Sequence, residues 1–373
     1  MSLSIPLFPM IEAFEHQDEA FASAFSILRE AIAGRAFPGA SVAVTSKGRL
    51  IALKGFGHFT YDLDSPAVSS STLFDLASVT KVVATTSMAM ILYQRGLLDL
   101  DMAVSTVLPE FVSNAEKDSR RHDVTFRRLL SHSAGLPAYE KLFLKAATRE
   151  DLLRAAFEVP LGENPGSRAE YSDIGFILLG ITLERLADES LDRFCQREIF
   201  SPLGMKSTAF NPPTALRAQI PPTADDRIFR HRIIQGEVQD ENASVLGGVA
   251  GHAGVFSTAE DLAYFVHIML SPAGVLRRKT VEIFTRREAA PTGTSRALGW
   301  DTPSAPSQSG RYFGPGSFGH LGYTGTSVWI DPVRQLSITL LTNRTWPDCS
   351  NQTIKQVRPR FHDAVVEALG PNE

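Results

Sequence analysis

Ser78 and Lys81 stand three positions apart at the start of a strongly apolar segment, in the tetrapeptide SVTK. Segment 79–93 (VTKVVATTSMAMILY) predicts a helix that is apolar or small on nearly every side, and Gly96 provides a C-terminal stop. Lys81 is the only charged residue of this segment, and residues three apart share a helix face. An amine in a dry site has a lowered pKa and can accept the proton of a nucleophilic serine.

The same tetrapeptide also has ordinary explanations. About one S-x-x-K match is expected by chance in a chain of this composition, and this chain contains one. Ser78 could be a simple helix N-cap, and Lys81 could extend its charged end along the apolar surface to solvent. The catalytic interpretation therefore depends on the rest of the chain.

Two further segments hold residues that could do chemistry. Tyr171 opens a second apolar helical segment in the tripeptide YSD, where a tyrosine by itself is usually a packing residue. Segment 314–326 (GPGSFGHLGYTGT) is dense in glycine and leads into a strand, which suggests close backbone approach to a ligand. A phosphate loop is disfavoured because G-x-x-x-x-G-K-[ST] is absent and no helix follows. Segment 247–254 (GGVAGHAG) is similar to 314–326.

His132 and His252 are ambiguous, since each could be a ligand, a core histidine or a turn residue. There is no H-E-x-x-H motif and no cluster of His, Asp and Glu at ligand spacing, so we expect neither a metal site nor a cofactor. A G-x-S-x-G elbow is also missing, which argues against the α/β-hydrolase form of serine chemistry.

Composition restricts the possible partners. Hydrophobic content of 43%, charged content of 21% and a net charge of −4 are those of an ordinary globular protein, with no electrostatic footprint for nucleic acid or anionic membrane. No run approaches the roughly 18–20 apolar residues that a membrane-spanning helix needs. The chain of 373 residues is long for one compact unit, so we expect two lobes or an inserted domain.

Cysteines and the start of the chain say little about the compartment. Cys195 and Cys349 are the two cysteines, and they suggest neither a disulfide framework nor a zinc cluster; Cys195 is expected to be a buried free thiol. Segment 1–14 lacks a basic n-region and is broken by two prolines, so no signal peptide is expected. The compartment stays open, cytoplasmic or, if leading residues have been removed, periplasmic or secreted. The oligomeric state is open too.

The elements that must position these residues are strands at both ends of the chain and helices between them. Runs 40–45 and 50–55 are joined by a Ser-Lys-Gly turn and predict a hairpin. Runs 327–330 and 336–342, joined at Asp331-Pro332, predict a second strand pair. Helical patterns are found at 19–33, 149–158, 173–187, 191–200, 258–270 (with a capping box at Ser257-Thr-Ala-Glu260) and 353–369, whereas 201–246 is irregular.

This order predicts an α/β (α+β) fold in which an antiparallel sheet, flanked by helices, is built from both termini. Residues 1–75 and 255–373 would form the sheet domain. Residues 76–254 would form an inserted, mostly helical domain. We expect the active site at the junction of the two.

The order of the motifs resembles the class C β-lactamase superfamily of penicillin-binding-protein-like serine hydrolases, which includes DD-peptidases, D-aminopeptidases and β-lactamase-related esterases. Those proteins have S-x-x-K, Y-x-N and K-T-G or H-x-G boxes in this order. The likeness extends over 38–343 and implies a β-lactamase/transpeptidase-like fold. The matching boxes are Ser78-x-x-Lys81, Tyr171-x-Asp173 and His320-Leu321-Gly322, with flanking phrases at 129–137, 251–262 and 319–332.

The resemblance implies a role for each matching residue. Ser78 would be the nucleophile and form an acyl-enzyme, and Lys81 would assist its deprotonation. Tyr171 would pass the proton to the leaving group and activate the deacylating water. The backbone N–H groups of Ser78 and of Tyr323, expected on the strand after the glycine-rich box, would form the oxyanion hole.

The substrate-binding residues implied by the resemblance are Asp173, His320 and Gly322, with His320 flanking the substrate as a hydrogen-bond donor. Asp173 stands where the family commonly has Asn, and its anion near Lys81 would favour the ammonium form. Proton abstraction would then shift toward Tyr171, whose phenolate the cation would stabilise. His320 stands where penicillin-recognising enzymes usually have Lys, and a histidine with a pKa near 6.5 is a weaker anchor for a carboxylate.

We therefore expect a serine hydrolase that acts on a carboxylic ester or a D-amino-acid-type amide, small molecules without an obligatory free carboxylate. One alternative is a β-lactamase or DD-carboxypeptidase acting on β-lactams or peptidoglycan peptides. An alternative of another class is a catalytically silent member used for binding or assembly.

Overall fold

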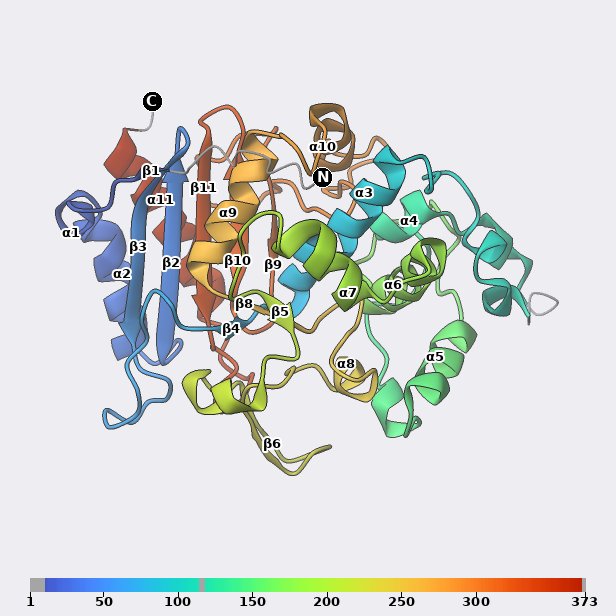
Figure 1. Cartoon of the computed structure of the whole chain (residues 1–373), viewed down its shortest axis with the longest axis horizontal. Helices are drawn as coiled ribbons and strands as arrows, with labels where there is room; N and C mark the ends of the chain where they lie inside the picture. Colours follow the sequence, from blue (N-terminus) through green and yellow to red (C-terminus); the bar gives the residue numbers. More distant parts are fainter. Residues whose placement is uncertain (1–10, 114–117, 371–373) are drawn as a thin grey trace, which may run out of the picture.

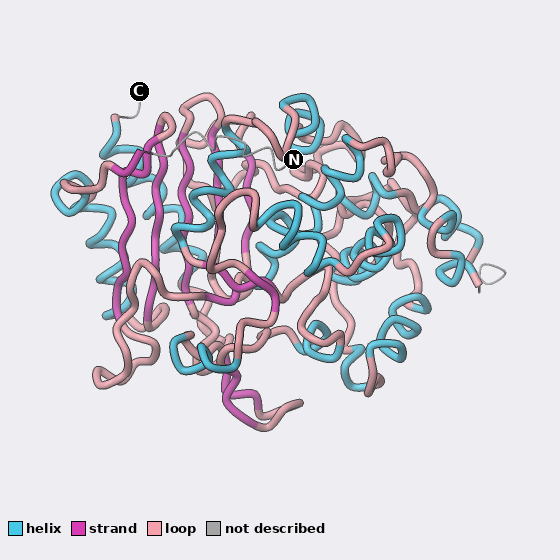
Figure 2. Tube along the Cα trace, viewed as in Figure 1, coloured by secondary structure: helices cyan, strands magenta, loops and turns pink. Residues whose placement is uncertain are grey.

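A six-stranded sheet occupies one end of the molecule, with most of the helices beside it (Figures 1 and 2). The computed structural model describes residues 11–113 and 118–370. The strands, in spatial order, are β1 (Ile11–Glu12), β3 (Arg49–Gly57), β2 (Gly39–Ser46), β11 (Leu336–Thr342), β10 (Ser327–Asp331) and β9 (Phe318–Leu321). The predicted sheet from both ends of the chain is therefore confirmed. It is antiparallel except at one edge, where β1 pairs in parallel with β3.

Both predicted hairpins form. The β2–β3 turn places Lys47 and Gly48 at φ values of 50° and 77°, the left-handed conformation that a tight hairpin requires. Strand β9 was not predicted, because it lies inside the glycine-rich run. Gly319 in β9 faces Trp329 of β10 so closely that a Cβ would lie 2.5 Å from the Val328 carbonyl oxygen.

Helices cover both faces of the sheet (Figure 1). Helices α2 (Ala22–Ala33) and α11 (Ile354–Leu369) pack together on one face, and α9 (Ala259–Leu270) packs on the other. Strand β2 serves both cores, since Val42 and Val44 point to the α2/α11 side and Ala43 to the α9 side. This alternation is the two-residue period of a strand.

The predicted helical insertion is present. Predictions 149–158 and 173–187 match α5 (Arg149–Glu158) and α6 (Asp173–Ala187). The remaining helices are α1 (Gln17–Ala20), α3 (Ser87–Gln94), α4 (Phe126–Leu130), α7 (Leu191–Cys195), which continues as a π-helical turn Gln196–Phe200, α8 (Glu241–Val245) and α10 (Arg278–Thr285). Within the irregular region 201–246 lie only short elements, namely β5 (Ala209–Phe210), a 3₁₀ helix (Thr214–Gln219), β6 (Ala224–Asp226), β7 (Arg232–Ile234) and α8.

The chain enters and leaves the helical region side by side. Strand β4 (Phe74–Asp75) pairs with β8 (Val255–Ser257), which also pairs with β5. The domain limits at 75/76 and 254/255 stay a prediction.

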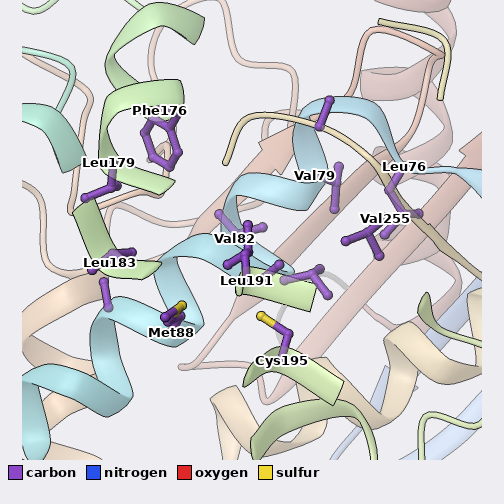
Figure 3. Packing of buried hydrophobic residues seen from close by; sticks show 14 of the residues in the cluster. Leu76, Val79, Val82, Met88, Phe176, Leu179, Leu183, Leu191, Cys195 and Val255 are labelled. Carbon is purple, nitrogen blue, oxygen red and sulfur yellow. The ribbon is translucent and has the colours of Figure 1, made fainter. Parts of the chain in front are cut away.

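The helix predicted after Ser78 is buried in the middle of the helical region. It comprises a 3₁₀ turn at Ala77–Val79, a π-helical stretch at Lys81–Thr86 and then α3. Figure 3 shows its apolar side chains in one cluster with those of α6 and α7, including Val79, Val82, Met88, Phe176, Leu179, Leu183, Leu191 and Cys195. Lys81 is fully buried, so it does not reach solvent. Cys195 is a buried free thiol, as predicted.

One local prediction was wrong. The α9 cap begins one residue later than expected, because Thr258 is the N-cap and accepts from the Asp261 N–H at 3.1 Å. Within segment 247–254, Gly251 allows close packing against α6, and the approach of this segment to a ligand stays a prediction. A Cβ on Gly251 would clash with the Phe176 carbonyl and lie 3.0 Å from Gly180 of α6.

Among the residues that the structure describes, no helix is long and apolar enough to cross a membrane. The expectation about a signal peptide concerns segment 1–14, of which residues 1–10 lie outside the described residues.

Candidate active site

Ser78 follows a strained residue at the start of the buried helix. Ala77 has φ +47°, a conformation that residues other than glycine rarely adopt and that is concentrated at functional sites. The Asp75 carboxylate accepts the Ala77 N–H at 2.8 Å and the Gln239 N–H at 2.7 Å. The sequence indicated the serine but neither of these supports.

Lys81 brings the predicted residues together. Its Nζ lies 3.0 Å from Ser78 Oγ, 2.6 Å from Tyr171 Oη, 2.6 Å from Asp173 Oδ1 and 3.1 Å from the His252 carbonyl oxygen. An ammonium has three N–H donors. Four oxygens surround Nζ, so an ammonium cannot donate to all of them. A neutral amine has a lone pair, and the hydroxyl of Ser78 or of Tyr171 can then donate to Nζ.

Tyr171 completes the contact with the serine. Its Oη lies 2.6 Å from Ser78 Oγ and 3.1 Å from Asp173 Oδ1. Tyr171 therefore touches the serine, the amine and the carboxylate at once. A hydroxyl in this position can accept one proton while it donates another.

The electrostatics differ from those expected with Asp173. Complete burial lowers the pKa of Lys81 below its ordinary value, and this outweighs the opposing effect of the Asp173 carboxylate. Burial, followed by the same carboxylate, raises the pKa of Tyr171 well above its ordinary value. The expected shift toward a Tyr171 phenolate was wrong, because the anion that pairs with Lys81 also lies against the phenol. The site favours a neutral tyrosine beside a lysine that loses its proton easily.

His132 and His252, ambiguous in the sequence, both support this cluster. His132 Nδ1 accepts the Ser172 N–H at 3.1 Å, and its ring lies 4.8 Å from the Tyr171 ring. Burial lowers the pKa of His132 well below 6.5, so the ring is neutral. His252 Nε2 contacts Asp240 Oδ1 at 2.8 Å, which fixes the loop whose carbonyl holds Lys81.

Arg296 was missed as well. Its guanidinium lies 5.6 Å from the centre of the Tyr171 ring and 3.6 Å from the Asp301 carboxylate. No local sequence pattern identified Arg296 or Asp240, because the fold brings each of them to the site from a segment far from Ser78 in the sequence.

His320 lies in β9 rather than at the start of a later strand, and its hydrogen-bonding role differs from the expected one. Its Nδ1 donates to the Leu321 carbonyl oxygen at 2.8 Å, because a carbonyl can only accept. Burial, followed by the charge of Lys81, lowers the pKa of His320 well below 6.5. In the neutral ring Nε2 then has a lone pair, so this nitrogen is an acceptor and not the expected donor.

Tyr323 lies in the turn between β9 and β10 and not, as expected, on a strand. Within the described part of the chain, the backbone N–H of Ser78 and that of Tyr323 have no hydrogen-bond partner. Two buried hydroxyls fasten this turn to the segment before the serine. Thr324 Oγ1 donates to the Asp75 carbonyl at 2.9 Å and Thr326 Oγ1 to the Leu76 carbonyl at 2.8 Å.

Gly322 permits this close approach. A Cβ there would clash with Thr326 Oγ1 and lie 2.5 Å from the Leu76 carbonyl oxygen. The glycine therefore allows the turn to pack against the residues before Ser78.

The predicted residues line a cleft of about 790 Å³. Ser78, Tyr171, Asp173, His320, Gly322 and Tyr323 all border it. One wall comes from the helical region, with Tyr139, Phe143 and Glu241, and the other from the end of the chain, with Arg344, Lys355 and Arg358. Within residues 11–113 and 118–370, no group of three or more His, Cys, Asp or Glu side chains is arranged to hold a metal ion.

The family follows from a comparison with known proteins. The Beta-lactamase family model matches residues 24–356. The chain belongs to the Beta-lactamase family. This member is 34% identical over 354 residues to an N-acetylmuramyl-L-alanine amidase of Bacillus subtilis (strain 168), covering 85% of this chain and 79% of the relative. It is 31% identical over 357 residues to a putative D-alanyl-D-alanine carboxypeptidase of Salmonella agona (strain SL483), covering 85% and 81%.

Solved structures support the β-lactamase/transpeptidase-like fold. EstCE1, a hydrolase with promiscuous acyltransferase activity, has a TM-score of 0.75 at 23% identity, covering 94% of this chain and 99% of that one. A class C β-lactamase from Rhodobacter sphaeroides has a TM-score of 0.72 at 21% identity, covering 94% and 99%. As a Beta-lactamase family member, the protein is a serine hydrolase.

Proposed function

We propose that this hydrolase cleaves a carboxylic ester or a D-amino-acid-type amide through an acyl-enzyme on Ser78. The observation that carries the proposal is the contact geometry of one oxygen atom. Ser78 Oγ lies 3.0 Å from an amine with a lowered pKa and 2.6 Å from a neutral phenol, beside an open cleft. This arrangement opposes a catalytically silent role, for which such contacts would have no use.

In acylation, Ser78 Oγ attacks the substrate carbonyl carbon as its proton moves to Lys81, the proposed base. The bond to the leaving group then breaks. Tyr171, in contact with both Lys81 and Ser78, delivers its proton to the leaving oxygen or nitrogen and takes one from Lys81. In deacylation, water attacks the acyl carbon, its proton passes through Tyr171 to Lys81, and Ser78 Oγ regains a proton as the acid leaves.

The N–H groups of Ser78 and Tyr323 are the proposed oxyanion donors. Neither has a partner among the described residues, so both are free to bind a developing negative charge. The start of a buried helix adds a favourable dipole at Ser78.

The relatives favour the amide branch of this proposal. One is named as an amidase and the other as a putative D-alanyl-D-alanine carboxypeptidase. Cleavage of cell-wall peptides or of β-lactams is therefore the second candidate, and His320 in place of Lys argues against efficient β-lactam turnover.

Labelling with a fluorophosphonate probe, followed by intact-mass measurement, tests the nucleophile. Wild type should gain one adduct and Ser78→Ala none, with the free energy of unfolding changed by about 1 kcal/mol at most. Ser87→Ala is the matched control, since Ser87 is buried in the same helix but bonds only to the Val82 carbonyl. An adduct that persists in Ser78→Ala would disprove the assignment.

The substrate class is tested with a panel of nitrophenyl esters, nitrocefin and D-alanyl peptides. We expect turnover of esters or of D-alanyl amides and little turnover of nitrocefin. Rapid nitrocefin hydrolysis without ester or peptide cleavage would favour the β-lactamase alternative.

A further inference from the structure

Residues 238–240 support the catalytic centre at two places, of which the first is the turn before the nucleophile. The backbone N–H of Gln239 donates to Asp75 Oδ2 at 2.7 Å, and Asp75 Oδ1 accepts the N–H of Ala77 at 2.8 Å. Ala77 directly precedes Ser78, and its strained backbone conformation persists only where surrounding contacts impose it. Gln239 is therefore one of the contacts that hold Ser78 in place.

The second place is the lysine. Asp240 Oδ1 lies 2.8 Å from His252 Nε2, and the His252 carbonyl oxygen lies 3.1 Å from Lys81 Nζ. Burial lowers the pKa of Lys81, and the carboxylates of Asp173 and Asp240 oppose this shift. The guanidinium of Arg296 acts in the same direction as burial. Two neighbouring residues, 239 and 240, thus act on the nucleophile and on its base.

Arg230 holds this segment from behind. Its Nη1 donates to the Val238 carbonyl at 2.7 Å and its Nη2 to the Gln239 carbonyl at 2.6 Å. Its Nε donates to Asp226 Oδ2 at 2.8 Å, and the side chains of this ion pair are only 7% and 6% exposed. Each guanidinium nitrogen therefore has an acceptor. Because the guanidinium is planar and rigid, it fixes the two carbonyls relative to each other and to Asp226.

Asp226 in turn holds the loop of the β6–β7 hairpin, which lies at the lower edge of the molecule in Figure 1. Its Oδ1 accepts the N–H groups of Ile228 at 3.0 Å and of Phe229 at 2.9 Å. Ile228 borders the catalytic cleft, and the Phe229 ring lies 4.9 Å from the ring of Phe143 on the helical wall. The loop is thus a well-bonded unit that extends from the rim of the cleft to residues 238–240.

We propose that Arg230 is a positioning residue of the hydrolase site, which holds residues 239 and 240 where they support Ser78 and Lys81. The inference rests on the proposed function, since it concerns the same nucleophile and base, and it adds the β6–β7 hairpin to their support. Arg230 acts through backbone carbonyls, so its loss should slow acylation and leave substrate binding almost unchanged.

Steady-state kinetics on a nitrophenyl ester test the proposal. Arg230→Gln should lower kcat roughly tenfold to a hundredfold, as for a small misplacement of reacting groups, with KM little changed. Arg230→Lys keeps the charge beside Asp226 without the rigid fork, and should lower kcat less; it serves as the test variant if Arg230→Gln does not fold. Arg232→Gln is the matched control, because Arg232 belongs to the same hairpin but pairs with Glu237 at the surface. A wild-type kcat in folded Arg230→Gln would overturn the proposal.

The pH profile of fluorophosphonate labelling separates positioning from a general loss of stability. If Asp240 moves away in Arg230→Gln, the pKa of Lys81 falls, because the Asp240 carboxylate raises it, and the acid limb moves to lower pH. Loss of the Arg230 charge by itself would act in the opposite direction, since removing a cation raises the pKa of an amine.

A double-mutant cycle completes this test. Asp240→Asn should move the acid limb to lower pH as well, and adding Arg230→Gln to it should move the limb no further. An acid limb that stays in place or moves upward in Arg230→Gln, or two shifts that add, would mean that Arg230 does not act through Asp240 and would overturn the proposal.

Hydrogen exchange distinguishes failure of this inference from failure of the proposed function. The N–H groups of Gln239 and Ala77 both donate to Asp75, so in Arg230→Gln they should exchange faster relative to the amides of strands β2 and β11. In Arg232→Gln they should exchange as in wild type. This measurement needs no reaction at Ser78, so it would stand even if the probe formed no adduct. Unchanged exchange of both N–H groups in Arg230→Gln would overturn the inference even in an active enzyme.

Discussion

The Asp75 carboxylate accepts a 2.8 Å hydrogen bond from the backbone N–H of Ala77, the residue directly before the proposed nucleophile. Ala77 has a left-handed backbone conformation. The second carboxylate oxygen of Asp75 accepts from Gln239, so one buried side chain connects the turn before Ser78 to the wall of the cleft. The strained turn thus depends on a buried side chain whose two oxygens each accept a backbone N–H.

Asp75→Asn should loosen this turn, because an amide offers one acceptor where the carboxylate has two. We expect slower fluorophosphonate labelling of Ser78 and a loss of about 1–3 kcal/mol in the free energy of unfolding, the usual effect of leaving a buried donor unsatisfied. Denaturant unfolding and labelling rates measure the two effects. Asp64→Asn, at an exposed position, is the control.

The same residue should produce a pH dependence of stability. Burial raises the pKa of Asp75 from 3.8 to about 6, so ionisation of this group opposes folding. Its contribution to the free energy of unfolding is fully present below about pH 4 and is lost as the pH rises through 6. Unfolding curves between pH 4 and 7 should therefore show a smaller pH dependence in Asp75→Asn than in wild type; identical dependence in both would contradict the assignment.

Tyr171→Phe should lower kcat by roughly 10²–10⁴, the usual effect of losing general acid–base catalysis, with KM little changed. The phenol is the group that contacts both Ser78 and Lys81, and phenylalanine keeps the ring against His132. Steady-state kinetics on a nitrophenyl ester measure the effect, with Tyr264→Phe as a tyrosine control on α9. An unchanged kcat would mean that Tyr171 has a structural role.

Asp173→Asn should move the acid limb of the pH–kcat/KM profile to lower pH. The Asp173 carboxylate raises the pKa of Lys81, so removing it lowers that pKa and leaves more neutral base in acid solution. Labelling rates from pH 5 to 9 follow the limb. If the limb stays in place or moves upward, Lys81 is not the group that must lose a proton.

His320→Lys should increase acylation by penicillins relative to nitrophenyl esters, because a permanent cation can pair with their carboxylate. In wild type the ring is neutral, since its pKa lies well below 6.5, so ionisation of His320 should cause no loss of ester activity from pH 6 to 8. The ratio of acylation rates in folded wild type and mutant decides the matter. A flat or falling ratio would show that His320 does not set carboxylate preference.

Periodic patterns and box order predicted much of the fold and the centre of the site. The long helices α5 and α6 have strong apolar periods, and both hairpins have clear turn signals. Ser78, Lys81 and Tyr171 were recognisable because their spacing follows helix geometry and a known order of motifs. Each of these signals is local, or repeats along the chain.

The unpredicted features depend on contacts between distant segments. Asp240 contacts the site through His252. Arg358 borders the cleft from the last helix, and the sequence does not distinguish it from the other arginines of that helix. Strand β9 escaped prediction because its glycine, unfavourable in an isolated strand, is required beneath Trp329. The phenolate hypothesis was wrong because a sequence does not show that one carboxylate contacts both the lysine and the tyrosine.

The hydroxyls of Thr324 and Thr326 connect the turn that contains Tyr323 to the backbone before Ser78, and so fix the positions of the two proposed oxyanion donors relative to each other. Both threonines bond to the backbone directly before Ser78, so the separation of the two N–H groups is held by bonds a few residues away from each. A small displacement of the helical wall would change the width of the cleft but not the distance between the Ser78 and Tyr323 N–H groups. Replacing Tyr139 or Phe143 on that wall should therefore change the size of substrate that the cleft accepts, whereas the positions of the two oxyanion donors stay the same.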